Sequence, residues 1–320
     1  MLKAVWSSLR NSRPLRVMLG ATNARVANHK VKKTKIERPR MSLSLPARDG
    51  ESNSTSVVAL QDPSEIAIAA VFHNEAEYLK EWIEFHLMVG VDRLYLYDNG
   101  STDNFLPILE PYLDRQQMVL MPWAPFLFDV NSQRLAYAHA ACNCRPTVRW
   151  LLLIDIDEFL FSETSDDIKP IFAKFKDFAA LTIPRFEFGP NNHKDKPSGL
   201  VIENYTRVSK REFNLRDEWK SAIQPNKVMD IRTHESLVSG ETLLMQPVDS
   251  RPLELRINHY FSKSESEFEN KLRRWYSWKN PDRSKQRNFA KKKALLKAIV
   301  ESDGGEYPMT KFVERLKARV

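Results

Sequence analysis

The chain has 320 residues, of which 42% are hydrophobic and 28% charged, so it is large enough to bury a sizeable core. Its uncharged apolar runs are of strand length, well short of the ~20 residues of a membrane-spanning helix, so we do not expect an integral membrane protein. The net charge of +8 is concentrated at the two ends and leaves the middle acidic, which argues against a nucleic-acid-binding protein.

Both ends of the chain are basic. Residues 1–48 contain twelve Lys and Arg residues against Glu37 alone, and residues 271–320 contain fifteen against five acidic residues. Ends of this kind are either solvated tails or a means of attachment to an anionic membrane surface. Apolar residues near the start fall at the helical spacing that suits a lipid interface: Leu2, Val5, Trp6 and Leu9.

The cysteine content and the first residues bear on the compartment. Cys142 and Cys144 are the only cysteines, too few for a disulfide framework, which agrees with a reducing environment. Residues 1–20 contain no continuous apolar stretch of the kind found in a cleaved secretory signal. We therefore expect a cytoplasmic protein, with peripheral attachment to the inner membrane face as the functional interpretation of the basic ends.

Residues 65–161 alternate between segments typical of strands and of helices. The predicted strands lie at residues 66–72 (IAIAAVF), 92–98 (DRLYLYD), 117–121 (QMVLM) and 150–154 (WLLLI). The predicted helices lie at residues 75–90, 104–113 and 131–144. This alternation indicates parallel crossover units and an α/β domain with an open, mainly parallel sheet. We expect a basic arm and linker at 1–64, the α/β domain at 65–270 and a basic helical extension at 271–320.

Polar residues follow three of the predicted strands. They are His73, Asn74 and Glu75 after the first, residues 98–103 (DNGSTD) at the end of the second, and Asp155, Asp157 and Glu158 after the fourth. In open α/β sheets, ligands bind at the carboxyl ends of the strands. The sequence contains neither GxGxxG nor GxxxxGK[ST], which argues against a Rossmann dinucleotide site and a P-loop.

Asp155 and Asp157 are candidate ligands of a divalent cation. Two residues apart at an extended strand end, they project to the same side, and paired carboxylates hold Mg²⁺ or Mn²⁺ through oxygen. Such an ion would bridge a diphosphate. The alternative is that the Asp-Ile-Asp-Glu sequence only ends a strand and caps the next turn. The position of this sequence beside the polar residues that follow the first and second strands favours a metal site.

Three segments together resemble glycosyltransferase family 92 and its bacterial relatives. They are FHNEAEYLKEWIEFHLMVGVDRLYLYDNGSTDN at 72–104, SQRLAYAHAAC at 132–142 and WLLLIDIDEFLF at 150–161. The resemblance continues more loosely through KVMDIRTHES and INHYFSKSESEFENKLRR. It implies the glycosyltransferase-A fold, with residues 65–270 as the catalytic domain.

The resemblance also implies roles for individual residues. Uridine and its phosphates would be bound by His73, Asn74, Glu75, Asp98, Ser101, Asp103, Gln133 and Arg134. Asp155 and Asp157 would carry the metal, and a later histidine, either His234 or His259, would complete the metal site. We favour His259, because the basic segment that follows it would bring Arg273 and Arg274 to the diphosphate.

By the same resemblance, the expected reaction is metal-dependent transfer of a sugar, possibly galactose, from a UDP-sugar to a glycan or lipid-linked acceptor. Bound Mn²⁺ or Mg²⁺ would stabilise the charge that develops on the leaving diphosphate. If the reaction inverts the sugar, a carboxylate must take the acceptor proton. Asp217 and Glu218 are the candidate bases.

Two other functions fit parts of the pattern. A haloacid-dehalogenase-like phosphatase also has a strand that runs into DxD, but it requires Thr or Val where this chain has Phe159. A non-catalytic carbohydrate- or partner-binding module on a transferase fold would not need the acidic residues that this chain retains. Release of UDP from UDP-sugars in the presence of Mn²⁺ would separate a transferase from both.

Overall fold

The computed structural model describes residues 65–123, 132–144, 147–209, 219–245, 252–277, 294, 304–307 and 309–320. The predicted arm at 1–64, the candidate bases Asp217 and Glu218, and the side chain of Arg274 lie outside the described residues. None of the helices within the described ranges combines the length and the apolar character needed to cross a bilayer.

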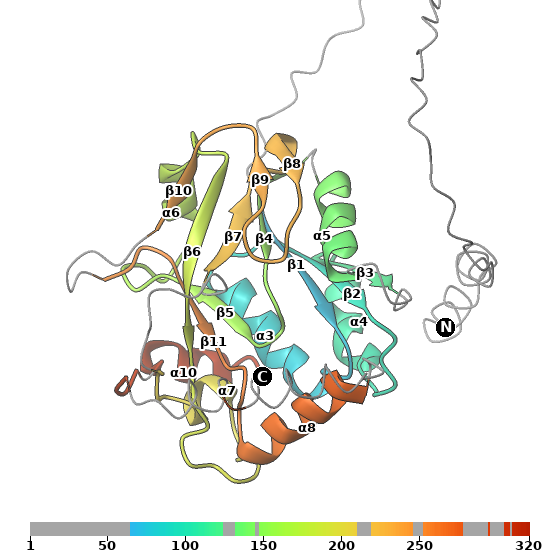
Figure 1. Ribbon diagram of the computed structural model, residues 1–320, viewed down its shortest axis with the longest axis vertical. Coiled ribbons are helices and arrows are strands. Elements are labelled where there is room, and N and C mark those ends of the chain that lie inside the picture. The colour runs from blue at the N-terminus through green and yellow to red at the C-terminus, as the bar shows by residue number, and fades with distance from the viewer. Residues whose placement is uncertain are drawn as a thin grey trace, which may run out of the picture.

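The core of the molecule is a mixed sheet (Figure 1). Its nine strands are β1 (Glu65–Phe72), β2 (Arg93–Asp98), β3 (Met118–Pro122), β4 (Val148–Leu153), β5 (Glu158–Phe161), β6 (Ala180–Glu187), β7 (Trp219–Ile223), β10 (Thr242–Leu244) and β11 (Arg256–His259). Their order is β3-β2-β1-β4-β7-β6-β11-β5, with β10 beside β6. A separate hairpin consists of β8 (Val228–Asp230) and β9 (Leu237–Val238).

The sheet combines a parallel half with an antiparallel half. Strands β3, β2, β1 and β4 are parallel to one another, whereas β7 runs antiparallel to both β4 and β6. Beyond β6, β11 is parallel to β6 and antiparallel to β5. Strands β4 and β5 are consecutive in the chain but lie apart in the sheet. The turn of residues 155–158, which ends on the first residue of β5, therefore connects the parallel half of the sheet to the antiparallel half.

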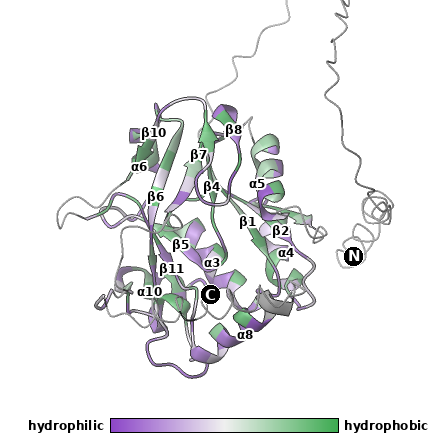
Figure 2. Ribbon diagram, viewed as in Figure 1, coloured by the Kyte–Doolittle hydropathy of each residue, from purple (hydrophilic) through white to green (hydrophobic). Residues whose placement is uncertain are grey.

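Helices cover both faces of the parallel half. The helices are α3 (Ala76–Met88), α4 (Leu106–Asp114), α5 (Ser132–Asn143), α6 (Lys169–Lys174), α7 (Val201–Asn204), α8 (Glu265–Ser277) and α10 (Thr310–Lys317), with a 3-10 turn η1 (Pro225–Lys227). Side chains of β1 alternate between the two faces, as a strand requires: Ile66 and Ile68 join the core under α3 and α4, and Ala67 and Ala69 join the core under α5. The central strands are accordingly hydrophobic along their length (Figure 2).

Helix α10 packs against α3. Phe312 and Leu316 of α10 are fully buried, and the ring of Phe312 lies 5.3 Å from that of Phe85 on α3 and 5.5 Å from that of Phe161 on β5. Part of the predicted basic extension therefore belongs to the core of the domain. The predicted boundary at 270/271 falls inside α8.

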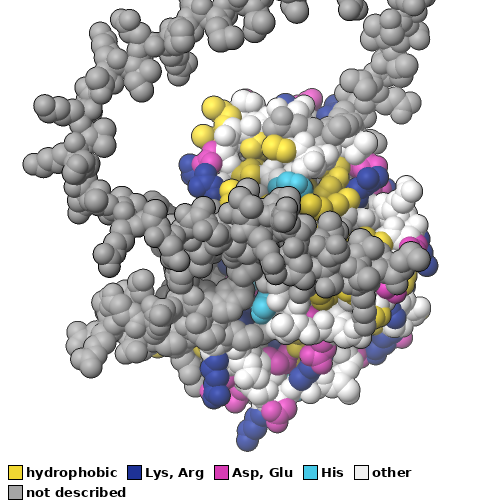
Figure 3. Space-filling model, turned by 90° about the vertical axis from the view of Figure 1, so that its right-hand side faces the viewer, with side chains coloured by type: hydrophobic (Ala, Val, Ile, Leu, Met, Phe, Trp, Pro, Cys, Tyr) yellow, Lys and Arg dark blue, Asp and Glu magenta, His cyan; other side chains and the backbone are white. Residues whose placement is uncertain are grey.

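The predicted elements between 65 and 161 are present close to the expected positions, and the α/β class is confirmed. On the face of the molecule shown in Figure 3, basic and acidic side chains are interspersed where described residues are visible. Exposed charges also pair elsewhere on the surface, as Arg315 does with Asp166 at 2.8 Å.

Candidate active site

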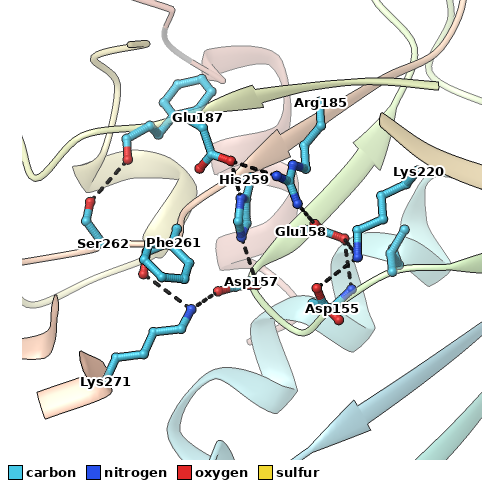
Figure 4. Close-up of polar contacts among 12 residues, drawn as sticks. Asp155, Asp157, Glu158, Arg185, Glu187, Lys220, His259, Phe261, Ser262 and Lys271 are labelled. Atoms are coloured by element: carbon cyan, nitrogen blue, oxygen red, sulfur yellow. Dashed lines mark hydrogen bonds and ion pairs between the residues drawn. The ribbon is translucent and has the colours of Figure 1, made fainter. Parts of the chain in front are cut away.

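The turn of residues 155–158, here called the carboxylate turn, is held by the backbone and by helix α3. The amide of Glu158 donates to the carbonyl oxygen of Asp155 (3.0 Å), and the amide of Tyr260 donates to the carbonyl oxygen of Asp157 (2.8 Å). From α3, the indole Nε1 of Trp82 donates to the carbonyl of Glu158 (2.8 Å). These contacts fix the orientation in which the turn presents its carboxylates, which Figure 4 shows among their side-chain partners.

Lys220 neutralises the first half of the turn. This residue of β7 is 1% exposed, and its Nζ lies 2.9 Å from Asp155 Oδ2 and 3.2 Å from Glu158 Oε2. The other oxygen of Asp155 accepts hydrogen bonds from Gln133 and from the hydroxyl of Tyr137. Burial alone would raise the pKa of Asp155, but Lys220 outweighs burial and holds it below its usual value.

Asp157 and His259 form the second half of the site. The imidazole Nε2 of His259 lies 3.4 Å from Asp157 Oδ1, and its Nδ1 lies 2.7 Å from Glu187 Oε1. Arg185 pairs with Glu187 at 3.1 Å and with Glu158 at 2.9 Å, which joins the two halves in one chain of contacts (Figure 4). The second oxygen of Asp157 pairs with Lys271 of α8.

The charges of this network shift two more pKa values. Burial would raise the pKa of Asp157, but Lys271 and His259 hold it well below its usual value, so the carboxylate is ionised at neutral pH. Burial would lower the pKa of His259, but Glu187 and Asp157 together outweigh burial and raise the pKa to about 9. The site therefore contains buried carboxylates whose charge is balanced by protein cations.

The residues present fit a divalent cation that takes further ligands from its substrate. Within the described ranges there is no cluster of three or more His, Cys, Asp or Glu side chains placed to hold a metal ion. Asp157 and His259 do supply an oxygen and a nitrogen on adjacent positions, and Glu187 accepts from Nδ1 of His259. Because the raised pKa keeps the ring of His259 protonated at neutral pH, its Nε2 must release a proton to bind a metal ion. One or two protein ligands plus phosphate oxygens is a usual arrangement for such ions at nucleotides.

The residues predicted to bind the nucleotide join the loops after β1 and β2 to each other. Asn74, in a left-handed conformation with φ of 55°, accepts on its side-chain Oδ1 from the amide of Thr102 (2.7 Å). The amide of Asn74 donates to Ser101 Oγ (2.9 Å), and Nδ1 of His73 lies 3.0 Å from the carbonyl oxygen of Asn99. These contacts join the loop after β1 (residues 73–75) to the end of β2 and the loop that follows it (residues 98–103) at the edge of the sheet. The two loops are here called the double loop.

Two acidic residues of the double loop stabilise its ends. The Oδ1 of Asp98, which is 1% exposed, accepts from the amide of Ser101 (2.7 Å). The Oδ2 of Asp103 accepts from the amide of Ala76 (2.8 Å), the first residue of α3, where a carboxylate also interacts favourably with the helix dipole. Glu75 directly precedes that helix and is partly buried.

The other predicted site residues lie in different surroundings. Arg134 pairs with Asp230 of β8, and Arg273 is 77% exposed and lies 3.4 Å from Glu269 one turn away on α8. His234 lies between β8 and β9, and its carbonyl accepts from Ser221 Oγ (2.8 Å). Of the two candidate histidines, it is His259 that the structure brings to Asp157.

Sequence reasoning missed five charged residues around the carboxylate turn. They are Arg185, Glu187, Lys220, Lys263 and Lys271. Lys263 is 7% exposed, and its Nζ lies 3.7 Å from the centroid of the Tyr78 ring. A usable signal was present for Lys220, because a lysine inside the apolar strand sequence WKSAI needs a buried partner.

Comparisons with known proteins identify the family of the chain. The model of glycosyltransferase family 92 matches residues 63–295. A family 92 protein of Ricinus communis is 28% identical over 211 residues, which are 62% of this chain and 36% of that protein. One of Oryza sativa subsp. japonica is 28% identical over 202 residues, 61% of this chain and 33% of that protein. The chain thus spans about a third of the length of these relatives.

Solved structures show only a partial likeness. Staphylococcus aureus TarS is 16% identical, with 50% of this chain and 47% of that chain covered and a TM-score of 0.32. Glucosyl-3-phosphoglycerate synthase of Mycobacterium tuberculosis is 14% identical, with 51% and 57% covered and a TM-score of 0.31. The assignment rests on the family model, which covers most of the described chain. The chain therefore belongs to glycosyltransferase family 92.

Proposed function

We propose that the protein is a metal-dependent glycosyltransferase that moves a sugar from a UDP-sugar to a glycan or lipid-linked acceptor. The observation that carries the proposal is the meeting of Asp157 and His259 at the carboxylate turn, within 3.4 Å of each other, in a chain of glycosyltransferase family 92. These two side chains come from segments about a hundred residues apart, and a purely structural turn does not require this pairing.

Asp157 and His259 would hold the divalent cation, and Asp155, the other predicted carboxylate ligand, lies beside them with one oxygen paired to Lys220. When bound, Mn²⁺ or Mg²⁺ supplies Lewis-acid stabilisation of the diphosphate that leaves as the glycosidic bond breaks. Glu187 fixes the ring of His259 through Nδ1, and Lys220 keeps Asp155 ionised and immobile beside the site. The carboxylate turn is therefore preorganised before any donor binds.

The double loop after β1 and β2 lies at the same sheet edge and would bind the uridine. Its two loops are held together through Asn74, Ser101 and Thr102, which makes the backbone around them rigid. Asp98 and Asp103 keep this shape, so their contribution to nucleotide affinity would come in part through the loop. Galactose remains the proposed sugar on the resemblance alone.

The acceptor side of the proposal rests on the sequence. Asp217 and Glu218 are the proposed bases for the acceptor hydroxyl, and inversion of the sugar is the proposed outcome. The basic ends would bring the protein to an anionic cytoplasmic membrane surface when the acceptor is lipid-linked. Binding to anionic vesicles, but not to neutral ones, that weakens with added salt is the measurement for this part.

The test of the proposed function is UDP release from a panel of UDP-sugars with an acceptor mixture, with Mn²⁺, with Mg²⁺ or with EDTA. We expect release with at least one sugar and its loss in EDTA. Asp157→Asn keeps the volume but removes the charge, and it should reduce the rate by about 100-fold or more. The matched control is Asp177→Asn, at an exposed position after α6, which should leave the rate unchanged.

Two outcomes would contradict the proposal. Release of UDP from no UDP-sugar, together with no binding of UDP by calorimetry, would remove the nucleotide-sugar donor. Full activity of Asp157→Asn in EDTA would remove the metal from the mechanism while leaving the transferase in place.

A further inference from the structure

Asp157, the proposed metal ligand, already has a cation on each carboxylate oxygen. One oxygen faces His259 Nε2 at 3.4 Å, and the other pairs with the ammonium of Lys271. Lys271 Nζ also donates to the carbonyl of Phe261 (3.3 Å) and lies 4.0 Å from the centroid of that ring (Figure 4). A metal ion cannot use this oxygen of Asp157 while the ammonium occupies it.

A third cation stands close by. Lys263 is buried beside Tyr78, and burial together with the charge of nearby Lys271 lowers its pKa, although Glu75 and Asp157 oppose the shift. The region of Asp157 therefore holds His259, Lys263 and Lys271. A lone divalent cation that enters here meets several positive groups, and the interaction is unfavourable at such short range. A diphosphate brings the negative charge that reverses this balance.

The position of Lys271 allows its ammonium to move without the backbone. The residue lies in the second turn of α8, its side chain is 29% exposed, and a lysine stem has four rotatable carbons. Lys220, the other lysine on the carboxylate turn, differs in this respect, because its side chain is 1% exposed and bridges two carboxylates. Of the two lysines, Lys271 is therefore the more exposed and Lys220 the more tightly enclosed.

We propose that Lys271 is a displaceable counter-ion of Asp157 that moves to the diphosphate when a divalent cation and the nucleotide bind together. This inference rests on the proposed function. Before the ligands bind, the ammonium of Lys271 pairs with Asp157 and keeps the site from binding a metal ion in the absence of the nucleotide. When metal and diphosphate arrive together, Asp157 turns to the metal and the ammonium of Lys271 donates to a phosphate oxygen.

The consequence is a coupling between the two ligands. Because binding is reciprocal, Mn²⁺ must raise the affinity for UDP by the same factor by which UDP raises the affinity for Mn²⁺. Loss of Lys271 changes both sides of this relation. Mn²⁺ alone should bind more tightly, since the oxygen of Asp157 that paired with Lys271 becomes available, and UDP in the presence of Mn²⁺ should bind more weakly, since a phosphate contact is lost.

The experiment measures dissociation constants of the full chain rather than its activity. Mn²⁺ binding is measured by electron paramagnetic resonance of free Mn²⁺, without nucleotide, and UDP binding by calorimetry with and without Mn²⁺. In Lys271→Met we expect about tenfold tighter Mn²⁺ binding alone and about tenfold weaker UDP binding with Mn²⁺. Lys271→Gln serves as a second variant, and thermal melting verifies that each protein is folded.

Lys174→Met is the matched control, because Lys174 is an exposed lysine paired with Glu254 on another part of the surface. It should leave all three constants unchanged. Mn²⁺ binding without nucleotide that is no tighter in the Lys271 variants than in the wild type would overturn the inference. So would UDP binding with Mn²⁺ that does not weaken in these variants.

The same data separate this inference from the proposed function. If the wild type binds Mn²⁺ and UDP together but the Lys271 variants match it, only the role of Lys271 is wrong. If the wild type binds neither ligand and releases UDP from no UDP-sugar, the proposed function is wrong, and the role of Lys271 with it.

Discussion

His86 should make the protein less stable in mild acid. This residue of α3 is fully buried, its Nδ1 lies 2.8 Å from the carbonyl of Trp82, and its Nε2 accepts from the amide of Leu160 at 3.2 Å. The amide of Leu160 can only donate, so Nε2 carries no proton in this arrangement. Protonation would turn two donors toward each other inside the core, next to the strand that follows the carboxylate turn.

The size of the effect follows from the pKa of His86. Burial lowers this pKa from 6.5 to about 3, so the folded state binds fewer protons than the unfolded state between these values. Stability is therefore complete above pH 6.5 and is lost as the pH falls toward 3. Each pH unit below 6.5 costs about 1.4 kcal/mol, which amounts to about 2 kcal/mol between pH 7 and pH 5.

The assay is urea unfolding of the wild type and of His86→Gln at about pH 7, 6 and 5. Glutamine keeps a donor and an acceptor but cannot take up a proton, so other titrating groups cancel in the difference between the two proteins. At pH 7 the variant should be the less stable one, by about 1–3 kcal/mol, because its buried hydrogen bonds fit poorly. That gap should close by about 2 kcal/mol at pH 5. A gap that is the same at each pH would refute the reasoning.

Three further substitutions test the contacts that hold the site and the core around it in place. Lys220→Met removes the buried ammonium that pairs with Asp155 and Glu158, leaves Glu158 with Arg185 alone, and should lower the free energy of unfolding by about 3–5 kcal/mol in urea; a loss below about 1 kcal/mol would contradict the network. Phe312→Ala should cost about 3–5 kcal/mol, measured in the same way, since the ring is fully buried; a surface-like loss would show that α10 is not part of the core. Asp103→Ala removes an acceptor at the start of α3 and should cost about 1 kcal/mol while weakening UDP binding in calorimetry. Unchanged UDP affinity would count against a uridine site at the double loop.

The parallel half of the fold could be predicted from the sequence because its signals are local. Strand β1 is a short apolar run, and α3 places Leu79, Trp82 and Ile83 on one buried stripe, so each element could be recognised from its own residues. Asp155 and Asp157 were found for the same reason. Their spacing and their place after a buried strand are visible in one short segment.

The rest of the site depends on pairings that no short segment reveals. Arg185 and Lys220 reach the carboxylate turn because β7 inserts antiparallel between β4 and β6, an arrangement that the spacing of residues does not encode. Lys271 and Arg273 of α8 show the limit of prediction from the sequence. The sequence marked the arginine, but two residues on a helix point about 200° apart, so a helix that turns Lys271 to Asp157 turns Arg273 to solvent.

The contact between α3 and α10 has a consequence for how the protein is made. A ribosome adds residues in order, so α3 and every strand of the sheet are synthesised before α10 exists to cover Phe85 and Phe161. During that interval the nascent domain exposes aromatic surface on the helix whose Trp82 and His86 anchor the carboxylate turn. Transiently exposed surface of this kind binds chaperones or aggregates. The core beneath α3 is thus completed only after α10 has been synthesised and has packed against Phe85 and Phe161.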